Sequence, residues 1–419
     1  MGVLESLHTT AGAHPLRRMR PLAPPFYKFD LIYFLIGEEM AATMLKIGFD
    51  AKRLFNNVTG LGNYSRTLVR ALQEQFPENE YVLFTPRLTQ NDQTAYFLSQ
   101  NFKRKTSGVI PGALWRSFFL SVEARKTKID LFHGLSNELP AGIDRIGAKS
   151  VVTVHDLIFR FYKDDYPWID RAVYDAKFRY ACERADRIIA VSQSTKKDII
   201  THYAVPEEKI TVAYQACDER FFRDIPQQEI ETVRSKYRLP QRYLLYVGTV
   251  NRRKNLLSLV QALKELKRTV DLPLVVAGSG REYLRHVRTY VERNSLRDRV
   301  MFVPSAEPND LPAIYRGSAV FLYPSRYEGF GLPVVEALLC GVPVITSRVS
   351  SLPEAAGPGA HYIDPDNPAS ISEGIVKILN APDYARQLAE DGFRHARRFN
   401  PGDCAKKMMA VYEEVYKRK

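Results

Sequence analysis

One strand–helix–strand segment near the end of the chain restricts its fold more than any other. Residues 319–323 form a short apolar run that ends at a proline and predict a buried strand. Residues 334–339 predict an apolar helix, which Pro333 is suited to begin and Gly341 to end. Residues 342–346 predict the next strand. This order is typical of a parallel sheet in an α/β fold, which binds ligands at the carboxyl ends of its strands.

The loop between that first strand and the helix carries the sequence Glu328-Gly329-Phe330-Gly331. Glycines let a ligand approach the backbone closely, and a helix N-terminus favours an anion such as phosphate. Glu328 and Glu336 flank the loop eight residues apart, which is unexpected if phosphate is the whole ligand. A ligand that also has hydroxyl groups, as a sugar and a ribose do, would need such acceptors. A solvated acidic loop at a helix start is the alternative, and the spacing alone leaves both interpretations open.

The length and composition indicate a globular protein of more than one domain. The chain has 419 residues, which is enough for two or three domains. No run approaches the roughly 18–20 consecutive apolar residues of a membrane span. The four cysteines are scattered without metal-ligand spacing, so we expect a cytoplasmic protein without structural zinc.

The formal net charge of +13 suits nucleic acid, an anionic membrane surface or acidic small ligands. No nucleic-acid-binding signature is present, so we expect no nucleic-acid partner. A helix expected to begin at Pro111 carries Trp115, Phe118 and Phe119, with basic residues nearby. Core packing explains this segment, and peripheral contact with the inner face of an anionic membrane is the alternative.

The hydrophobic pattern divides the chain into four parts. Residues 1–43 are rich in proline and lack sustained periodicity, so we expect an extension outside the core, consistent with a misplaced start codon. Residues 44–225 and residues 226–399 each alternate strands with helices. They predict two doubly wound, Rossmann-like domains that face a cleft. Residues 400–419 form the last part and predict a terminal helix.

The first domain is also predicted to begin with a strand, a loop and a helix. Residues 45–50 predict a strand, and residues 64–75 predict a helix. Gly60 and Gly62 lie in the polar loop between them. This order is typical of a phosphate cradle, but a tight turn explains two such glycines equally well.

Two later positions of the first domain follow predicted strands. Residues 149–154 predict a strand that ends in His155 and Asp156. A histidine there is either a structural residue or a group that faces the cleft. Ser192 follows a strand expected at residues 187–191, and it is suited to cap the next helix.

The second domain opens with a basic loop. Residues 243–247 predict a strand, Gly248 follows it, and Arg253 and Lys254 precede the next helix. A guanidinium and a lysine aimed at one place suit a diphosphate, whereas alone they would form a solvated turn. Because parallel strands bring their carboxyl ends to one edge, we expect this pair beside Glu328, which favours the diphosphate interpretation.

Three motifs of the second domain resemble those of the family-four retaining glycosyltransferases of GT-B fold. They are Gly248-Thr249 with Arg253-Lys254-Asn255, PSRYEGFGLPVVEA at residues 324–337, and GVPVI at residues 341–345. The TGLGNY sequence of residues 59–64 resembles the first-domain loop of members that build bacterial surface polysaccharide. The resemblance covers about residues 44–419, and the EGFGLP core within its pair of glutamates is highly specific.

The resemblance implies a division of roles. Arg253 and Lys254 would neutralise the diphosphate of a nucleotide sugar, Glu336 would hold its ribose, and Glu328 would hold the transferred sugar. His155 would contact that sugar near its anomeric carbon, which gives a catalytic set of His155, Glu328, Arg253 and Lys254. The implied donor-binding residues are Gly60, Gly62, Ser192, Gly248, Arg253, Lys254, Glu328, Gly329, Phe330, Gly331, Leu332 and Glu336.

The resemblance also implies a reaction. A hexose, with mannose favoured, would move with retention from a GDP- or UDP-linked donor to a hydroxyl of a glycan or polyprenyl-linked acceptor. Basic residues would replace a cation at the diphosphate, so we expect neither metal nor cofactor. Residues 400–419 would form a helix that crosses back to the first domain. The alternatives are a nucleotide-sugar hydrolase or epimerase on the same fold, and an inactive lipid-surface binder.

Overall fold

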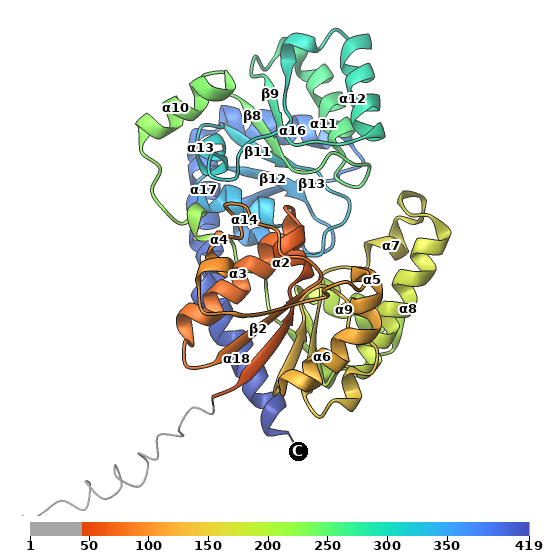
Figure 1. Cartoon of the computed structure of the whole chain (residues 1–419). Helices are drawn as coiled ribbons and strands as arrows, with labels where there is room; N and C mark the ends of the chain where they lie inside the picture. The colour runs from red at the N-terminus through yellow and green to blue at the C-terminus, as the bar shows by residue number, and fades with distance from the viewer. Residues whose placement is uncertain (1–43, 419) are drawn as a thin grey trace, which may run out of the picture. The chain divides into compact units, whose positions relative to one another are not determined.

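The computed structural model describes residues 44–418, and the expected extension of residues 1–43 lies outside this range. The described chain builds two sheets, each within its own α/β domain (Figure 1). Every strand pair in both sheets is parallel. The prediction of two doubly wound α/β domains is therefore confirmed.

The first sheet has seven strands in the order β3-β2-β1-β4-β5-β6-β7. Its strands are β1 (Lys46–Asp50), β2 (Glu80–Thr85), β3 (Lys103–Thr106), β4 (Leu131–Gly134), β5 (Lys149–Val154), β6 (Arg187–Ala190) and β7 (Ile210–Val212). The helices of this domain are α2 (Lys52–Asn56), α3 (Gly60–Gln75), α4 (Ala95–Ser99), α5 (Gly112–Leu114), α6 (Leu120–Thr127), α7 (Ile158–Phe161), α8 (Trp168–Arg184) and α9 (Gln193–Tyr203). A π-helical turn at Trp115–Phe119 joins α5 to α6.

The second sheet has six strands in the order β10-β9-β8-β11-β12-β13. They are β8 (Leu244–Val247), β9 (Leu274–Ala277), β10 (Val300–Val303), β11 (Val320–Tyr323), β12 (Val344–Ser347) and β13 (Ala360–Ile363). The helices from here to the end are α10 (Gln227–Tyr237), α11 (Leu256–Glu265), α12 (Glu282–Arg293), α13 (Leu311–Arg316), α14 (Leu332–Leu339), α15 (Leu352–Ala356), α16 (Pro368–Asn380), α17 (Pro382–Ala396) and α18 (Pro401–Lys417).

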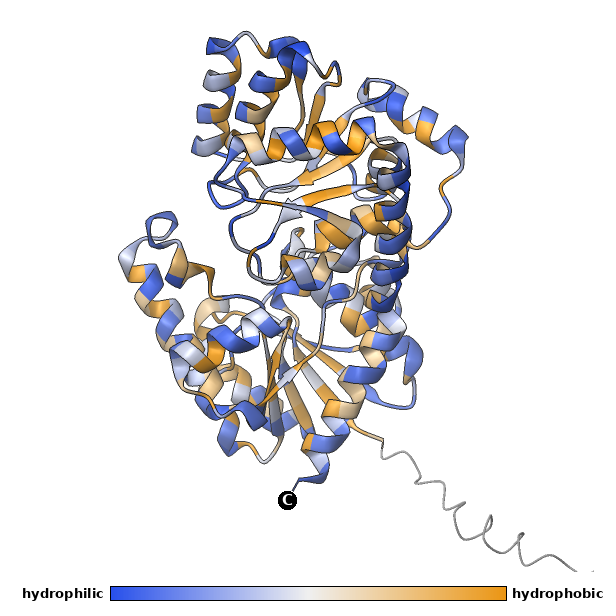
Figure 2. Ribbon diagram, turned by 180° about the vertical axis from the view of Figure 1, so that it is seen from behind, coloured by the Kyte–Doolittle hydropathy of each residue, from blue (hydrophilic) through white to orange (hydrophobic). Residues whose placement is uncertain are grey.

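Helices cover both faces of each sheet, and this explains why several central strands are apolar along their whole length. All four residues of β8, β9 and β11 are buried, and each of these strands reads as a continuous apolar run. Figure 2 shows hydrophobic strands inside each domain and hydrophilic faces on the helices around them. No helix within residues 44–418 is long and apolar enough to cross a membrane.

The last helix, α18, belongs to the second half of the sequence but packs on the first domain (Figure 1). Its buried Met408 and Tyr412 lie in one apolar cluster with Leu68 and Leu72 of α3. The hydroxyl of Tyr412 is 2.6 Å from Nδ1 of His133 on β4, which ties the helix to the sheet.

The structure differs from the sequence expectation in three places. Gly60 and Gly62 lie in the first turn of α3 rather than in a loop before it. The side chain of Asn57 accepts a hydrogen bond from the N–H of Gly62 (3.2 Å), so a free N–H of the helix start finds a partner. The helix expected from Pro111 is interrupted by the π-helical turn. The polar stretch at residues 87–110, whose structure the sequence pattern left open, contains α4 and β3.

Candidate active site

The strand–helix–strand segment forms β11, α14 and β12, with its glycine loop at the carboxyl edge of the second sheet. Gly331 precedes α14 with a φ of 110°, and Gly341 follows the helix with a φ of 68°. Both angles lie in the left-handed region that favours glycine. A Cβ atom on Gly331 would also lie 2.9 Å from Leu352, so a larger residue would strain both the backbone and the packing.

Glu328 lies in this loop with its carboxylate buried. Its Oε1 accepts hydrogen bonds from the hydroxyls of Tyr323 (2.8 Å) and Ser325 (2.9 Å), and it pairs with Nη1 of Arg253 at 2.7 Å. Burial alone would raise the pKa of Glu328, but the charges of Arg253 and Lys254 outweigh it and hold this pKa below its usual value. The carboxylate is therefore ionised at neutral pH.

Arg253 and Lys254 reach the same place from the loop after β8. Arg253 is 8% exposed, and its Nη1 also donates to the main-chain oxygen of Tyr327. The ammonium of Lys254 lies 5.2 Å from the ring centre of Tyr323. A Cβ atom on Gly248, whose φ is +134°, would lie 3.0 Å from that ammonium, so glycine leaves room for Lys254.

Glu336 projects from α14 and is the second acid of the pair. Its Oε2 accepts a hydrogen bond from the hydroxyl of Tyr315 (2.8 Å). Burial raises the pKa of Glu336 to about 7, while Tyr315 and Lys254 oppose that rise. The two glutamates thus differ in charge near neutral pH, although the charge of Lys254 lowers the pKa of both.

His155 lies at the carboxyl end of β5, as the sequence places it, but its ring is held by the protein. Nε2 lies 2.9 Å from the main-chain oxygen of Leu135, and Nδ1 lies 2.7 Å from the side-chain amide of Gln215. The ring of Tyr64 packs edge-on against it, with centres 4.6 Å apart. Burial lowers the pKa of His155 to about 4, so the ring is neutral and both of its nitrogens are engaged.

Of the remaining first-domain residues of the expected site, Gly62 and Ser192 have structural partners and Gly60 has none among residues 44–418. Gly62 packs against the main-chain oxygen of Asn57, which a Cβ atom would strike, whereas a Cβ atom on Gly60 would meet open space. Ser192 is the N-cap of α9, and its Oγ accepts a hydrogen bond from the N–H of Thr195 at 3.0 Å.

The glycine loop touches the first domain directly. A Cβ atom on Gly329 would collide with the main-chain oxygen of His155, so the close approach requires glycine. The hydroxyl of Thr195 lies 3.3 Å from the main-chain oxygens of both residues. Nearby, the hydroxyl of Tyr327 donates to Asp198 of α9 at 2.6 Å. The structure therefore brings the first-domain His155 to the edge of the loop that carries Glu328.

The expected apolar members of the site, Phe330 and Leu332, hold the loop in place. Phe330 is 2% exposed, and its ring packs against those of Tyr214 (5.6 Å between centres) and Phe399 (5.1 Å). Leu332 begins α14 and packs against the same core. Their side chains are therefore part of the interior, and any ligand contact falls to the backbone of the loop.

Two grooves border the charged cluster, and residues of both domains line each of them. The larger has a volume of about 1170 Å³ and runs along the loop that ends at Arg253. The smaller has a volume of about 420 Å³ and is lined by Asp218 and Arg220, whose charges act on Glu336. Both spaces are large enough for a small-molecule ligand.

Sequence reasoning missed the groups that orient the cluster. Tyr315, Tyr323 and Ser325 hold the two glutamates, but a tyrosine inside an apolar run gives no signal beyond core packing. Sequence reasoning also left out Asp50 and Glu138 of the first domain. Asp50 is the last residue of β1, so the rule that ligands bind at strand carboxyl ends could have found it.

Comparisons with known proteins agree with this architecture. The family described as "Glycosyltransferase Family 4" matches residues 58–221, and the family described as "Glycosyl transferases group 1" matches residues 228–395. The chain is 29% identical over 386 residues to O-antigen chain mannosyltransferase B of Escherichia coli, with 88% of this chain and 100% of that protein covered.

Two further matches are weaker, one because it covers only part of the related protein and the other because its sequence identity is low. The serotype-specific mannosyltransferase WbdA of Escherichia coli is 29% identical over 285 residues, which cover 65% of this chain but 34% of that longer protein. The crystal structure of Anabaena Alr3699/HepE in complex with UDP-glucose matches with a TM-score of 0.71 at 15% identity, over 88% of this chain and 100% of that chain. This last likeness shows the two-domain fold.

Proposed function

We propose, since this chain belongs to the group 1 and family 4 glycosyltransferases, that it transfers mannose to a hydroxyl group of a glycan or a polyprenyl-linked acceptor. The donor in this proposal is GDP-mannose, and the pathway is the assembly of a surface polysaccharide. The mannosyltransferase relatives support the sugar, and the TGLGNY sequence at residues 59–64 supports the nucleotide.

The observation that carries this proposal is a cluster of two basic and two acidic side chains at one sheet edge, of which Arg253 and Glu328 are buried and Lys254 and Glu336 are half-buried. Arg253 and Lys254 provide positive charge for a diphosphate, and a buried position makes that charge more effective than it would be in water. Glu328 and Glu336 provide acceptors for hydroxyl groups on either side of it. A nucleotide sugar has this order of groups: sugar, diphosphate and ribose.

A donor screen tests the proposal. Calorimetry with GDP-, UDP- and ADP-linked sugars, followed by product analysis, should give binding and transfer with GDP-mannose. Absence of binding to all of these donors would refute a transferase role, whereas a preference for another sugar would correct only the donor.

We further propose transfer with retention and without a metal ion. Glu328 and His155 are each held by protein groups, so neither is placed to attack the sugar. The leaving diphosphate can instead take the proton of the incoming hydroxyl on the same face of the sugar, while Arg253 and Lys254 stabilise its charge. Retention should appear in the anomeric NMR signal of the product, and EDTA should leave turnover unchanged.

A hydrolase or epimerase on this fold would need an acid or base near the anomeric carbon. His155 is the candidate from the first domain, and its neutral, doubly hydrogen-bonded ring disfavours that role. Release of free mannose without any acceptor product would nevertheless support the hydrolase.

The raised pKa of Glu336 predicts a pH dependence of donor binding. Ionised Glu336 can accept from ribose hydroxyls, and its ionised fraction rises as the pH passes about 7. We expect the affinity for GDP-mannose to increase up to about tenfold between pH 6 and pH 8, since one unit of pH changes the ionised fraction by up to tenfold. GDP-mannose, unlike GDP, has no phosphate group that titrates in this range.

The control for this pH series is Glu336→Gln, which should bind with a nearly flat profile. The folded pKa of Glu336 lies above the ordinary value, so its contribution to stability is present at low pH and is lost as the pH rises through about 7. Affinity and stability should therefore move in opposite directions, and a parallel fall of both would contradict a carboxylate role.

We also propose peripheral contact with the inner face of an anionic membrane. Leu114, Phe118, Phe119 and Val122 are 47–62% exposed on the segment from α5 to α6. Arg125, Lys126 and Lys128 follow on the same segment and are exposed. Apolar side chains beside exposed basic groups suit a surface of anionic lipid.

Replacing both Leu114 and Phe119 by serine should weaken binding to anionic vesicles, measured by sedimentation, about thirtyfold, because each exposed large side chain contributes roughly 1 kcal/mol on burial. Phe393→Ser is the matched control, since Phe393 is 42% exposed on α17 of the second domain. If the double variant and the parent bind equally to vesicles that contain phosphatidylglycerol, the segment from α5 to α6 does not contact the membrane.

A further inference from the structure

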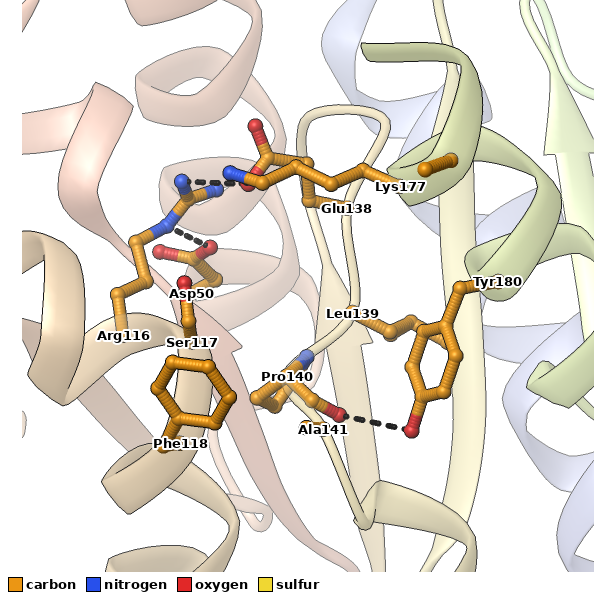
Figure 3. Close-up of a pocket in the computed structure, with 11 residues that line it drawn as sticks. Asp50, Arg116, Ser117, Phe118, Glu138, Leu139, Pro140, Ala141, Lys177 and Tyr180 are labelled. Carbon is orange, nitrogen blue, oxygen red and sulfur yellow. Dashed lines mark hydrogen bonds and ion pairs between the residues drawn. The ribbon is translucent and has the colours of Figure 1, made fainter. Parts of the chain in front are cut away.

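A pocket of about 260 Å³ opens in the first domain between the π-helical turn and α8 (Figure 3). Charged side chains gather at one end of it, where Arg116, Asp50, Glu138 and Lys177 meet. Apolar surface, including the ring of Phe118, lines the other end. The pocket thus offers polar and apolar surface to the same ligand, as small-molecule sites do.

The charged end is a connected network. Nε of Arg116 donates to Asp50 at 2.6 Å, and its Nη1 donates to Oε2 of Glu138 at 2.8 Å. The ammonium of Lys177 lies 3.2 Å from the same Oε2. Burial would raise the pKa of Glu138, but Arg116 and Lys177 outweigh it and keep this pKa below its usual value. Arg116 and Lys177 thus lie against two carboxylates, and the formal charges of these four side chains cancel.

Some hydrogen-bonding capacity is left over at this end. Within residues 44–418, no group donates to Oε1 of Glu138. Lys177 has three N–H groups, and one of them is used by Glu138. An acceptor and several donors thus remain side by side in a half-enclosed space.

The pocket lies at the edge of the sheet that faces the second domain. Asp50 ends β1, Glu138 follows β4, and His155 follows β5. These three strands are neighbours in the sheet, in the order β1-β4-β5. The pocket is therefore on the same edge as His155, whose main chain contacts Gly329 of the glycine loop.

We propose that this pocket binds an uncharged sugar ring of the acceptor, which deepens the transferase function proposed above and rests on it. A sugar hydroxyl both donates and accepts, so it can bond to Oε1 of Glu138 and to the ammonium of Lys177 at once. The C–H face of the ring can pack on Phe118 and Pro140 at the apolar end. The volume lies slightly below the ~300 Å³ at which drug-sized sites begin, so it suits one ring rather than a chain of rings.

The network also selects against a phosphorylated acceptor. Nε and Nη1 of Arg116 already pair with the carboxylates of Asp50 and Glu138, so a phosphate would have to approach the remaining N–H groups of Arg116 beside two carboxylates. Those carboxylates would also repel the phosphate, since they offset the positive charges of Arg116 and Lys177. The acceptor group at this pocket is therefore a neutral saccharide end.

The test uses the full chain and two kinds of probe. Methyl α-mannoside and α-linked mannobiose serve as neutral acceptors, and mannose 6-phosphate serves as the charged one. Ala176→Phe fills the pocket from the exposed face of α8, and Ala172→Phe is the same substitution one turn earlier, outside the pocket. Binding of GDP-mannose is measured for each protein by calorimetry, separately from acceptor kinetics.

The parent should use the neutral probes, and mannose 6-phosphate should neither bind nor compete. Ala176→Phe should lower kcat/KM for the neutral acceptor by at least about tenfold through lost hydrogen bonds and contact, with donor affinity unchanged. Ala172→Phe should match the parent. A pocket-filled variant that keeps its acceptor kcat/KM within twofold would overturn the proposal, as would a preference for mannose 6-phosphate. Failure of the parent to bind any nucleotide sugar would instead overturn the transferase function itself.

Glu138→Gln gives a second, independent measurement. It keeps the shape of the side chain but leaves Arg116 and Lys177 with excess positive charge, so mannose 6-phosphate should begin to compete with the neutral acceptor. Unchanged rejection of the phosphate by this variant would contradict the selectivity assigned to the network.

Discussion

Lys254→Ala is expected to weaken binding of GDP itself by roughly 10- to 100-fold, because a hydrogen bond to a charged group contributes about 1.5–3 kcal/mol. The ammonium of Lys254 lies 5.2 Å from the ring centre of Tyr323, and desolvation lowers the pKa of this lysine, while the charges of Glu328 and Glu336 oppose that fall. A charge held in such a position acts strongly on an incoming diphosphate. Calorimetry with GDP measures the loss directly.

The matched control is Lys264→Ala. Lys264 is exposed on α11 in the same domain, so this substitution removes the same charge without touching the cluster. If both variants bind GDP equally weakly, the effect comes from net charge, and Lys254 has no special role. If Lys254→Ala binds GDP as the parent does but loses GDP-mannose, the diphosphate assignment is wrong.

Glu328→Ala is expected to lower the free energy of unfolding by about 3–5 kcal/mol, the usual cost of leaving a buried charge without its partner. Arg253 lies 2.7 Å from Glu328 and is 8% exposed, so water cannot replace the lost carboxylate. Urea denaturation measures this loss. The double variant Arg253→Met with Glu328→Leu should recover much of it, because neither charge then remains unpaired.

Glu328→Gln separates the functional effect from the structural one. It keeps a hydrogen-bond acceptor for Tyr323 and Ser325 but removes the charge. We expect affinity for GDP to be kept or increased, since Arg253 is freed, while affinity for GDP-mannose falls. Equal losses for the two ligands would contradict the assignment of Glu328 to the sugar.

The fold could be predicted from the sequence where strands are buried on both faces. Residues 149–154 and 243–247 were expected as strands, and β5 (Lys149–Val154) and β8 (Leu244–Val247) match them to within one residue. The start of α3 could not be predicted, because glycines disfavour a helix and the contact of Gly62 with Asn57 gives no signal in the sequence. The π-helical turn at Trp115–Phe119 could not be predicted either, since a single such turn is too short to give a hydrophobic period in the sequence.

The candidate site also has parts that could be predicted from the sequence and parts that could not. The charged cluster could be predicted, because its members follow two strands of one parallel sheet. These strands, β8 and β11, are neighbours, so their carboxyl ends bring together Arg253, Lys254, Glu328 and Glu336. The position of His155 followed from the same rule, but the direction of its ring depends on Gln215, which lies 60 residues away. The pocket of Arg116 could not be predicted, because its four charged members come from four separate segments.

The start of α9 connects helix stability to domain movement. The carboxylate of Glu354, from the second domain, accepts hydrogen bonds from the main-chain N–H groups of Gln193 (2.7 Å) and Ser194 (2.9 Å) in the first turn of that helix. These are groups that a helix cannot satisfy within itself, and the acid also complements the positive end of the helix dipole. Half of the cap is therefore supplied by another domain. Any event that draws Glu354 away must leave the first turn of α9 less stable, and any ligand that favours closure must stabilise that turn by the same free energy.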